Sequence, residues 1–427
     1  MISFLSGRYD SVQEIAPDQR LRPTRGFGRQ WDEPTQPQLR GPHPEQGETG
    51  KHLPTARLTR LRVLALPAGI VLTVRALGLF IAWAMCAANN RPFNFQSWDG
   101  YFYFGLAVHG YGGFDPAVTY DKDGHYFPYA PMSFFPGYSL TVRLLGLLFG
   151  GHFLAAAVIL SLTASVVAGY GVARLARHAG AGQRGQLAAV ALTAGAPMSV
   201  VYSMPYPEAM LVALAAWTLV AVLERRWLLA GFGAAAAGLT SPMAGPLIPV
   251  VMAAGMVHLY RVRTHRIGAA VAVLVAPLGM LGYLLWARLV SGVPGGFFAI
   301  TDRGWGNHVD FGVATARWIF ESLTESRDTF AVLTATAIIA AVIATVRTPM
   351  PWPVWVYTAG TVALVVSHTG IIHDRVRLLL SAFPLLIVAA VRLARLRGRT
   401  TALVVGGVVL AGLWFSAYSL AVWPSSI

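Results

Sequence analysis

Apolar runs of bilayer length follow one another along most of this chain. A transmembrane helix needs roughly 17–25 apolar residues. We expect such helices at about residues 64–88, 153–173, 187–204, 207–223, 227–241, 245–260, 267–289, 329–346, 352–367, 376–391 and 401–422. The chain is 55% hydrophobic and 12% charged, whereas a soluble domain has about 25% charged residues. We therefore predict an all-α, polytopic membrane protein with about 11 transmembrane helices, within a range of roughly 10–12.

Basic residues gather in the short connections between the apolar runs, and they predict the orientation of the chain. The net charge is +14, and pairs such as Arg225 and Arg226, or Arg261 and Arg263, fall on one side of the predicted membrane. The positive-inside rule makes this side cytoplasmic. Beyond the N-terminal tail, the acidic residues fall on the opposite side, except Glu224. We expect a multi-pass protein of a bacterial-type plasma membrane, with its N-terminus in the cytoplasm and a polar working face outside.

The chain divides into a polar tail and a membrane domain. Residues 1–60 are rich in Pro, Gly, Gln and Arg and show no apolar periodicity, which is typical of a disordered, here cytoplasmic, tail. The membrane domain covers residues 61–427 and has two long outer loops, at about 89–152 and 290–328. Both loops are rich in aromatic residues, so we expect them to be structured. Residues 134–150 are expected to form a short helix at the outer interface, because a span there would place the arginine clusters outside.

One carboxylate stands inside an aromatic ribbon after the first span, in the stretch QSWDGYFYFGLAVHGYGGFD. Two interpretations of Asp99 stay open. With Ser97 as N-cap, Asp99 lies in the first turn of a helix, where the helix dipole favours a carboxylate. Alternatively, partial desolvation beside aromatic walls makes it a general base. In that case Trp98, Tyr101 and Tyr103 supply stacking surfaces for a sugar.

An Asp-x-Asp pair follows in the same loop and raises the question of a metal. Asp121 and Asp123 are candidates for holding a divalent metal on a sugar-phosphate, although an Asp-Gly turn at a loop tip is the favoured interpretation. His125, next to this turn, is interpreted as an ordinary surface histidine. Cys86 is the only cysteine, which excludes an intrachain disulfide and a cysteine-based metal site. We therefore expect no firm cofactor, with a divalent metal left open.

Two further polar groups stand at the outer mouths of predicted spans. Glu208 opens a span after Tyr-Pro, where it either supports the helix start or binds a polar ligand. The run HTGIIHDRVR crowds His373, Arg375 and Arg377 into a short connection. These side chains are suited to bind phosphate and stabilise it as a leaving group. The alternatives are an Asp–Arg pair that holds the helix ends together, or a zinc site, which lacks a third ligand.

Five stretches together resemble the PIG-V-like mannosyltransferases, of the GT-C class of membrane glycosyltransferases. In chain order they are SWDGYFYFGLAVHGY, FFPGYSLTVRLL, YSMPYPEAMLVAL, ERRWLLAGFGAAAAGLTSPMAG and RVRLLLSAFPLL. The resemblance implies that Asp99 is the base, that Glu208 is the family acid at a span mouth, and that Arg377 is the family basic residue. It also places His109 with the substrate-binding residues. The chain departs from the family at Ser241, where the family has Arg.

The resemblance implies a function on the outer face of the membrane. It implies transfer of mannose from a polyprenyl-phosphate-mannose donor to a hydroxyl of a lipid-linked or glycan acceptor, with inversion to an α-mannoside. The expected partners are this donor, a glycolipid or glycan acceptor and membrane lipids. Nucleic acid is not expected, since no nucleic-acid-binding motif is present. The alternatives are a transporter or flippase of a lipid-linked sugar, which favours pseudo-symmetric halves, and a non-catalytic scaffold.

Overall fold

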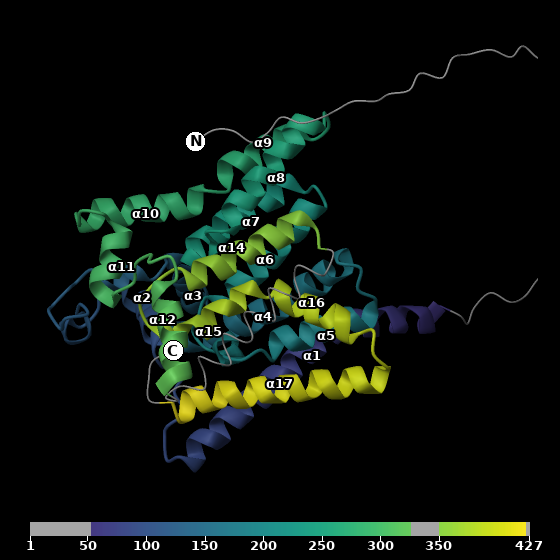
Figure 1. Ribbon diagram of the computed structural model, residues 1–427, viewed down its shortest axis with the longest axis horizontal. Helices are drawn as coiled ribbons and strands as arrows, with labels where there is room; N and C mark the ends of the chain where they lie inside the picture. Colours follow the sequence, from purple (N-terminus) through teal and green to yellow (C-terminus); the bar gives the residue numbers. More distant parts are fainter. Residues whose placement is uncertain (1–52, 326–349, 424–427) are drawn as a thin grey trace, which may run out of the picture. The chain divides into compact units, whose positions relative to one another are not determined.

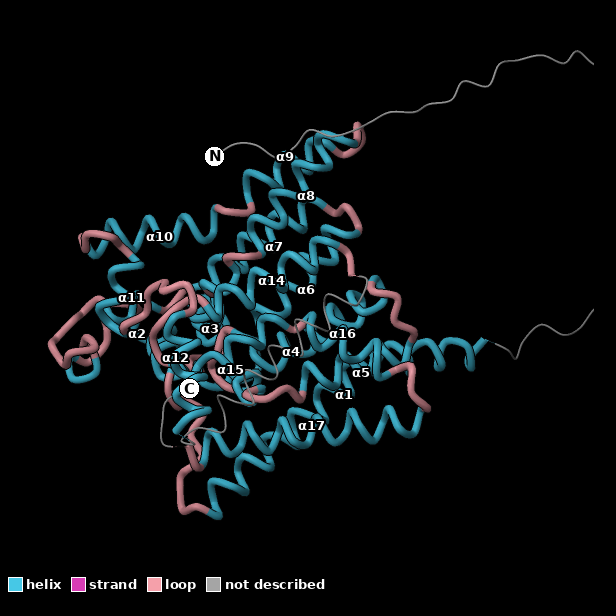
Figure 2. Tube along the Cα trace, in the orientation of Figure 1, coloured by secondary structure: helices cyan, strands magenta, loops and turns pink. Residues whose placement is uncertain are grey.

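The computed structural model describes residues 53–325 and 350–423, and these ranges are mainly helical (Figure 1). Figure 2 shows the helices joined by loops, with no strand in the described ranges. The only β-pairing described there consists of two isolated bridges, Tyr120–Tyr126 and Val309–His368. The all-α prediction is therefore confirmed. The predicted span at 329–346 and residues 1–52 of the predicted tail lie outside the described residues.

The helices follow one another in a simple order. The α-helices are α1 (Leu53–Ala88), α2 (Asp99–His109), α3 (Pro136–Leu148), α4 (Phe153–His178), α5 (Gln183–Ala194), α6 (Glu208–Leu223), α7 (Trp227–Thr240), α8 (Leu247–Arg261), α9 (Arg266–Val275), α10 (Leu278–Ser291), α11 (Phe297–Trp305), α12 (Val313–Glu325), α14 (Trp352–Val366), α15 (Arg375–Leu378), α16 (Pro384–Leu393) and α17 (Gly398–Ala421). Short 3-10 helices lie between them: η1 (Pro116–Val118), η2 (Ala130–Ser133), η3 (Ser199–Ser203), η4 (Pro242–Ala244), η5 (Ile372–Asp374) and η6 (Leu379–Ala382). Because α1 begins at Leu53, helix already starts inside the segment predicted as tail.

Length and composition mark this chain as an integral membrane protein. Five helical segments in the described ranges are long and apolar enough to cross a membrane: Ala65–Ala88, Phe153–His178, Pro242–Arg261, Arg266–Ser291 and Gly398–Ala421. A sixth is present if the bent pair Arg375–Ala382 and Pro384–Leu393 forms one span. Three shorter apolar helices are α6, α7 and α14. Each predicted span within the described ranges therefore contains helix, but the predicted count of about 11 is not confirmed.

Two predicted spans are not straight helices. The run expected at 187–204 is helical only to Ala194, after which η3 follows. The break contains Pro197, which lacks a backbone N–H, and Met198 in the left-handed region at φ 65°. Arg75 of α1, which is buried, donates to the backbone and the hydroxyl of Ser199 and so fixes the broken segment. The run expected at 376–391 is bent by 67° between η6 and α16.

Glu224, the acid that the sequence placed among the basic clusters, has partners of opposite charge at the end of α6. Its carboxylate accepts from Arg174 Nε at 2.5 Å and from Arg174 Nη2 at 2.9 Å. His178 and Arg226 lie 3.3 Å and 3.4 Å from it. Since Arg174 and His178 belong to α4, this cluster fixes the end of α4 against the end of α6. Glu224, the exception in the charge pattern, is thus the centre of an ion-pair cluster.

The segment between α1 and α4 is structured, as its composition predicts. It contains α2 and α3, which pack against each other, and α3 packs in turn against α4. Tyr138 of α3 is fully buried, and its hydroxyl bonds to Ser161 of α4 at 2.8 Å. The helix expected within 134–150 is α3, and its opposite side exposes Leu144, Leu147 and Leu148. An apolar helix surface of this kind is suited to contact lipid. Its location at the outer interface stays a prediction.

Candidate functional site

A cavity of about 550 Å³ lies where segments from both ends of the chain meet. Asp99 and Tyr103 of α2 and Glu208 of α6 line it together with Asp374 and Arg377 from the segment after α14. The remaining walls are mostly apolar and include Phe134, Phe135, Met280, Leu284, Phe297, Phe298, Leu364 and Leu378. A large cavity with a few convergent charged groups in an apolar lining is typical of a ligand-binding site.

An ion pair forms the polar wall of this cavity. Arg377 Nη2 lies 2.6 Å from Asp99 Oδ2, and Arg377 Nε lies 3.6 Å from Glu208 Oε1. Arg377 and Glu208 are each 5% exposed. The guanidinium also stands over the ring of Tyr206, 5.3 Å from its centroid. The structure therefore brings together the three predicted site residues that lie in α2, α6 and α15.

The local sequence explains how Asp99 is positioned. Trp98 is the N-cap of α2 and has a φ of 53°, so the chain turns sharply into the helix. Tyr206 is fully buried and donates its hydroxyl to Ser97 O at 2.8 Å. A Cβ on Gly100 would lie 2.9 Å from the Tyr206 ring, so only glycine fits beside Asp99 here. The prediction of Ser97 as N-cap is wrong, because its hydroxyl instead donates to Asn94 O at 2.9 Å.

Several polar atoms in this wall have no hydrogen-bond partner among the described residues. They are Arg377 Nε and Nη1, Glu208 Oε2 and Asp374 Oδ1. Buried polar atoms are nearly always hydrogen-bonded in folded proteins. Unpaired atoms that line a cavity therefore indicate a polar ligand that supplies the missing partners. An anion that accepts N–H groups of the guanidinium would suit Arg377.

Aromatic side chains form a second wall. Tyr103 is 7% exposed and lines the cavity, and its predicted sugar-binding role stays a prediction. Burial raises the pKa of its hydroxyl well above the ordinary value. Phe134 lies edge to face with both Tyr103, at 5.2 Å between ring centroids, and Trp305, at 5.7 Å. The sequence arguments missed Phe134 and Trp305, although both stand in the aromatic-rich loops that were singled out.

Other predicted residues of the aromatic ribbon lie elsewhere. Tyr101 is 40% exposed and packs edge to face on Phe102, 5.6 Å away. His109 is exposed at the end of α2. Trp98 is half-buried and packs against the main hydrophobic core. None of these three side chains lines the described cavity, so the structure does not place them with Arg377 and Glu208. Their predicted substrate-binding role stays untested.

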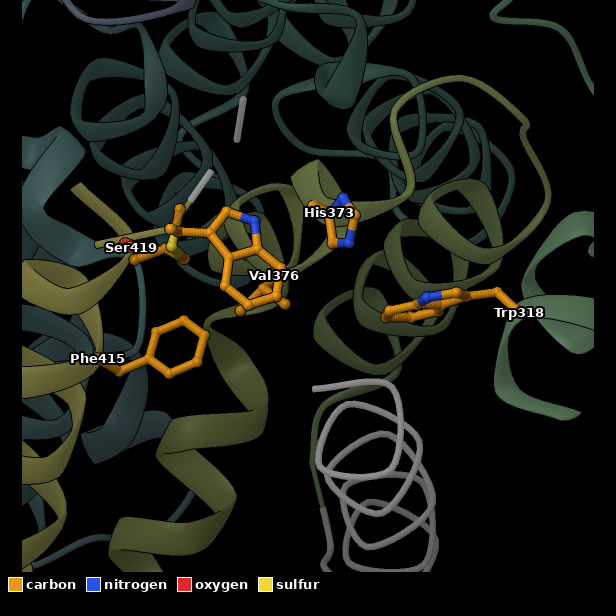
Figure 3. A pocket seen from close by; sticks show the side chains of 7 residues that line it. Trp318, His373, Val376, Phe415 and Ser419 are labelled. Atoms are coloured by element: carbon orange, nitrogen blue, oxygen red, sulfur yellow. The ribbon is translucent and has the colours of Figure 1, made fainter. Parts of the chain in front are cut away.

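Two residues of the run HTGIIHDRVR also point away from the cavity. Figure 3 shows His373 beside Trp318 in a small pocket that also contains Phe415 and Ser419. The His373 and Trp318 ring centroids lie 6.2 Å apart. Arg375 is 1% exposed and donates its Nη2 to His368 O at 2.5 Å. Of the three site residues predicted in this run, His373, Arg375 and Arg377, Arg377 alone lines the cavity.

The Asp-x-Asp pair forms a turn. Asp121 Oδ1 accepts from the backbone N–H of Asp123 at 3.1 Å and of His125 at 2.9 Å. Its Oδ2 lies 3.3 Å from Arg303 Nε. The His125 hydrogen bond and the Arg303 side chain lower the pKa of Asp121. The potential ligand atoms of Asp121, Asp123 and His125 lie within 4.8 Å of one another, but both oxygens of Asp121 are already engaged. This cluster fits a loop anchor better than a metal site.

The loop after α11 closes one side of the cavity against the segment after α14. Val309 and His368 form an antiparallel bridge. Thr369 N donates to His308 O at 2.8 Å, and Asp310 N donates to Ser367 O at 2.9 Å. This pairing holds His308 and His368 on the cavity wall. It also fixes the start of the segment that carries Asp374 and Arg377.

Comparisons with known proteins add a distant structural likeness. No protein-family model matches the chain, and no curated protein matches it. Among solved structures, the chain is similar to the archaeal oligosaccharyltransferase AglB from Archaeoglobus fulgidus in complex with an inhibitory peptide and a dolichol-phosphate, at 12% identity and a TM-score of 0.45. It is also similar to the Archaeoglobus fulgidus oligosaccharyltransferase in complex with Zn and sulfate, at 12% identity and a TM-score of 0.45.

These matches cover most of this chain but only part of the neighbours. The first covers 82% of this chain and 56% of AglB, and the second covers 83% and 53%. The chain thus spans about half the length of the oligosaccharyltransferases it resembles.

Proposed function

We propose that the protein is an integral-membrane glycosyltransferase. It moves a hexose, mannose by the resemblance to PIG-V-like enzymes, from a polyprenyl-phosphate donor to a hydroxyl of a lipid-linked or glycan acceptor. The observation that carries the proposal is the pairing of Asp99 with Arg377 at 2.6 Å in the wall of one cavity. A carboxylate can act as the base that accepts the acceptor proton, and a guanidinium can stabilise the departing phosphate.

Arg377 binds the donor phosphate in this proposal. Its Nη1 is buried without a hydrogen-bond partner, and the two terminal nitrogens of a planar guanidinium can present parallel N–H groups to one phosphate. The phosphate draws Arg377 toward itself and weakens its hold on Asp99. Asp99 is then free to accept the acceptor's hydroxyl proton. Donor binding and release of the base are thus coupled through one side chain.

The reaction is a single displacement. The acceptor oxygen forms a bond to the anomeric carbon and gives its proton to Asp99, while the bond from that carbon to the phosphate oxygen breaks. The bonding electrons leave with the polyprenyl phosphate, whose charge Arg377 stabilises. Attack from the face opposite the leaving group inverts the anomeric centre. Glu208 holds Arg377 in place from its second side.

The rest of the cavity fits the sugar and the polyprenyl chain of such a donor. Tyr103, Phe134 and Trp305 offer ring surfaces on which a sugar can stack. Met280 and Leu284 of α10 and Phe297 and Phe298 of α11 form an apolar wall for the first isoprene units. Ser241 also lines the cavity, at the broken end of α7. We place the polyprenyl groove at this end of α7.

The test is donor turnover by purified protein in nanodiscs. We would supply polyprenyl-phosphate-[14C]mannose with membrane lipid extract as acceptor source and follow release of polyprenyl phosphate and transfer of label. Wild type would be compared with Asp99→Asn and with Asp123→Asn, which makes the same change on an exposed loop residue outside the cavity lining.

We expect turnover by wild type and Asp123→Asn and a loss of at least about 10²-fold in Asp99→Asn, the range for removal of a general base. Equal turnover by wild type and Asp99→Asn would remove Asp99 from the mechanism. Donor binding without turnover by folded wild type, together with movement of labelled donor across sealed vesicles, would favour a transporter or flippase instead.

A further inference from the structure

Asp374 is a third carboxyl group in the wall of the cavity, and the sequence arguments gave it no role in the reaction. It ends η5, directly before the short helix that carries Arg377. It lines the cavity together with Asp99, Glu208 and Arg377. Its Oδ1 is buried without a hydrogen-bond partner in the described part of the chain. A carboxyl oxygen placed in this way can reach a group bound in the cavity.

The charges around Asp374 make an ionised carboxylate at this position unfavourable when a phosphate is bound beside it. Three carboxyl groups, those of Asp99, Glu208 and Asp374, line the cavity, and Arg377 is the arginine that lines it with them. Arg375 gives its Nη2 to the carbonyl oxygen of His368 instead. With all three carboxyl groups ionised, a phosphate beside Arg377 would meet an excess of negative charge. Protonation of one carboxyl group removes this conflict.

The surroundings of Asp374 favour its protonated form. The pKa of Asp374 is raised to about 7, mainly by desolvation; the positive charges of Arg377 and Arg375 oppose this rise, and the negative charges of Asp99 and Glu208 add to it. His368 and His308 face the same cavity, and burial lowers the pKa of His368. A carboxyl group that its surroundings keep protonated can serve as a general acid.

We propose that Asp374 is a second catalytic carboxyl group, which gives its proton to the departing phosphate. The inference rests on the proposed glycosyl transfer. As the bond between the anomeric carbon and the phosphate oxygen breaks, the Asp374 carboxyl proton passes to a phosphate oxygen. At the same time the acceptor proton passes to Asp99. After product release, Asp99 is protonated and Asp374 ionised, and solvent returns one proton and removes the other.

The proposal predicts a specific dependence of turnover on pH. Because Asp374 acts in its protonated form, wild-type turnover at saturating donor falls as pH rises through the region of its pKa. Asp374→Asn keeps a hydrogen-bond donor of similar size but has no proton to give. We expect it to lose about 10²-fold in turnover, a typical contribution of general acid catalysis. We also expect its alkaline fall to disappear and its binding of polyprenyl phosphate to stay within about threefold of wild type.

The experiment compares wild type, Asp374→Asn, Asp374→Glu and His308→Gln in nanodiscs between about pH 5.5 and 9. Asp374→Glu restores a proton donor. It should therefore regain part of the turnover, and this turnover should again fall at alkaline pH. His308→Gln should keep the alkaline fall, because a different titratable cavity residue is removed. Binding of radiolabelled polyprenyl phosphate and thermal unfolding are measured for each variant to separate the acid role from donor binding and folding.

The outcomes separate this inference from the proposed function. If Asp374→Asn has the same turnover rate as wild type and the same fall in turnover at alkaline pH, the acid role is overturned and the proposed function is not. Parallel loss of phosphate binding and turnover in Asp374→Asn, with no recovery in Asp374→Glu, also overturns it and makes Asp374 a structural partner of the arginines. Absence of transfer by folded wild type overturns the proposed function, and the acid role with it.

Discussion

The Nη2 of Arg377 lies 2.6 Å from Oδ2 of Asp99, although the two residues belong to opposite halves of the sequence. The pair joins the first turn of α2 to α15, and Glu208 adds a contact from α6. Arg377 is almost fully buried, whereas the Asp99 side chain is 25% exposed. Removal of one partner of such a pair leaves a buried charge without compensation, which costs about 3–5 kcal/mol.

The first prediction concerns the coupling within this pair. Arg377→Met should lower the free energy of unfolding by about 3–5 kcal/mol, because Asp99 and Glu208 lose their positive partner. Asp99→Asn combined with Arg377→Met should recover part of this loss. Thermal unfolding of the single and double variants forms a double-mutant cycle that checks this. Additive losses would show that the two side chains do not interact in the protein.

Arg377→Lys separates charge from geometry in the same pair. Lysine keeps the positive charge but has no planar fork with two N–H groups. We expect nearly normal unfolding, and a fall of about 10²-fold in donor kcat/KM, which is the equivalent of losing roughly 2.7 kcal/mol of phosphate binding. The initial rate of polyprenyl phosphate release over a range of donor concentrations measures this. An unchanged kcat/KM would argue against bidentate phosphate binding.

Gly100 gives a second prediction, on the positioning of Asp99. A Cβ at this position would lie 2.9 Å from the Tyr206 ring and 3.3 Å from Phe95 O. Tyr206 cannot move freely, since it is fully buried and its hydroxyl is bonded to Ser97 O. Gly100→Ala should therefore destabilise the protein by about 1–3 kcal/mol, the usual cost of overpacking, and should lower turnover by displacing Asp99.

The matched control for this prediction is Gly112→Ala. Gly112 follows α2, is exposed, and has nothing within 4 Å of an added Cβ. We expect unfolding temperature and turnover close to wild type for this variant. If Gly100→Ala behaved like Gly112→Ala in both measurements, the close contact between α2 and Tyr206 would not control the site.

Local patterns predicted the helices well because length and apolar content decide them. They failed where a tertiary contact overrides the pattern. The run at 187–204 is apolar throughout, yet it breaks at Pro197, and Arg75 from another helix binds the segment that follows. Ser97 has the composition of an N-cap, but Trp98 takes that position with a positive φ. Neither of these features can be read from the pattern of apolar residues.

The site was predictable only in part, for a similar reason. Asp99, Glu208 and Arg377 stood out because each is a charged residue at the edge of an apolar run. Tyr101 and Tyr103 could not be ranked from the sequence, since residues two positions apart lie on nearly opposite sides of a helix. The structure buries Tyr103 and exposes Tyr101. Trp305 ends α11 and Asp374 ends η5, and the segments that lie between them in space pair through Val309 and His368, a contact that the sequence pattern does not contain.

The third prediction concerns metal removal. Both carboxylate oxygens of Asp121 already have partners, and those partners are backbone N–H groups and Arg303. Chelation with EDTA should therefore leave wild-type turnover within about twofold, since no step in the proposed transfer uses a cation. Asp123→Asn should behave in the same way. A loss of turnover on chelation that Mg²⁺ restores in wild type but not in Asp123→Asn would instead establish a metal site at this loop.

The last prediction uses the ion-pair cluster at the end of α6. The hydrogen bonds from Arg174 lower the pKa of Glu224. A carboxyl group with a lowered pKa in the folded state stabilises the fold above its unfolded pKa of about 4.3, and this contribution is lost as the pH falls through the lowered value. Glu224→Gln should therefore unfold at a lower temperature than wild type at pH 7, and the difference should shrink below about pH 4.

Glu321→Gln is the control, because it makes the same change on an exposed residue of α12. Its unfolding temperature should stay near that of wild type across the pH range. Turnover of Glu224→Gln at pH 7 should also stay near wild type, since Glu224 does not line the cavity. A difference between Glu224→Gln and wild type that is as large at pH 3 as at pH 7 would show that packing rather than the ion pair stabilises this end of the helices, because an ionic contribution must decrease as the pH falls below the unfolded pKa.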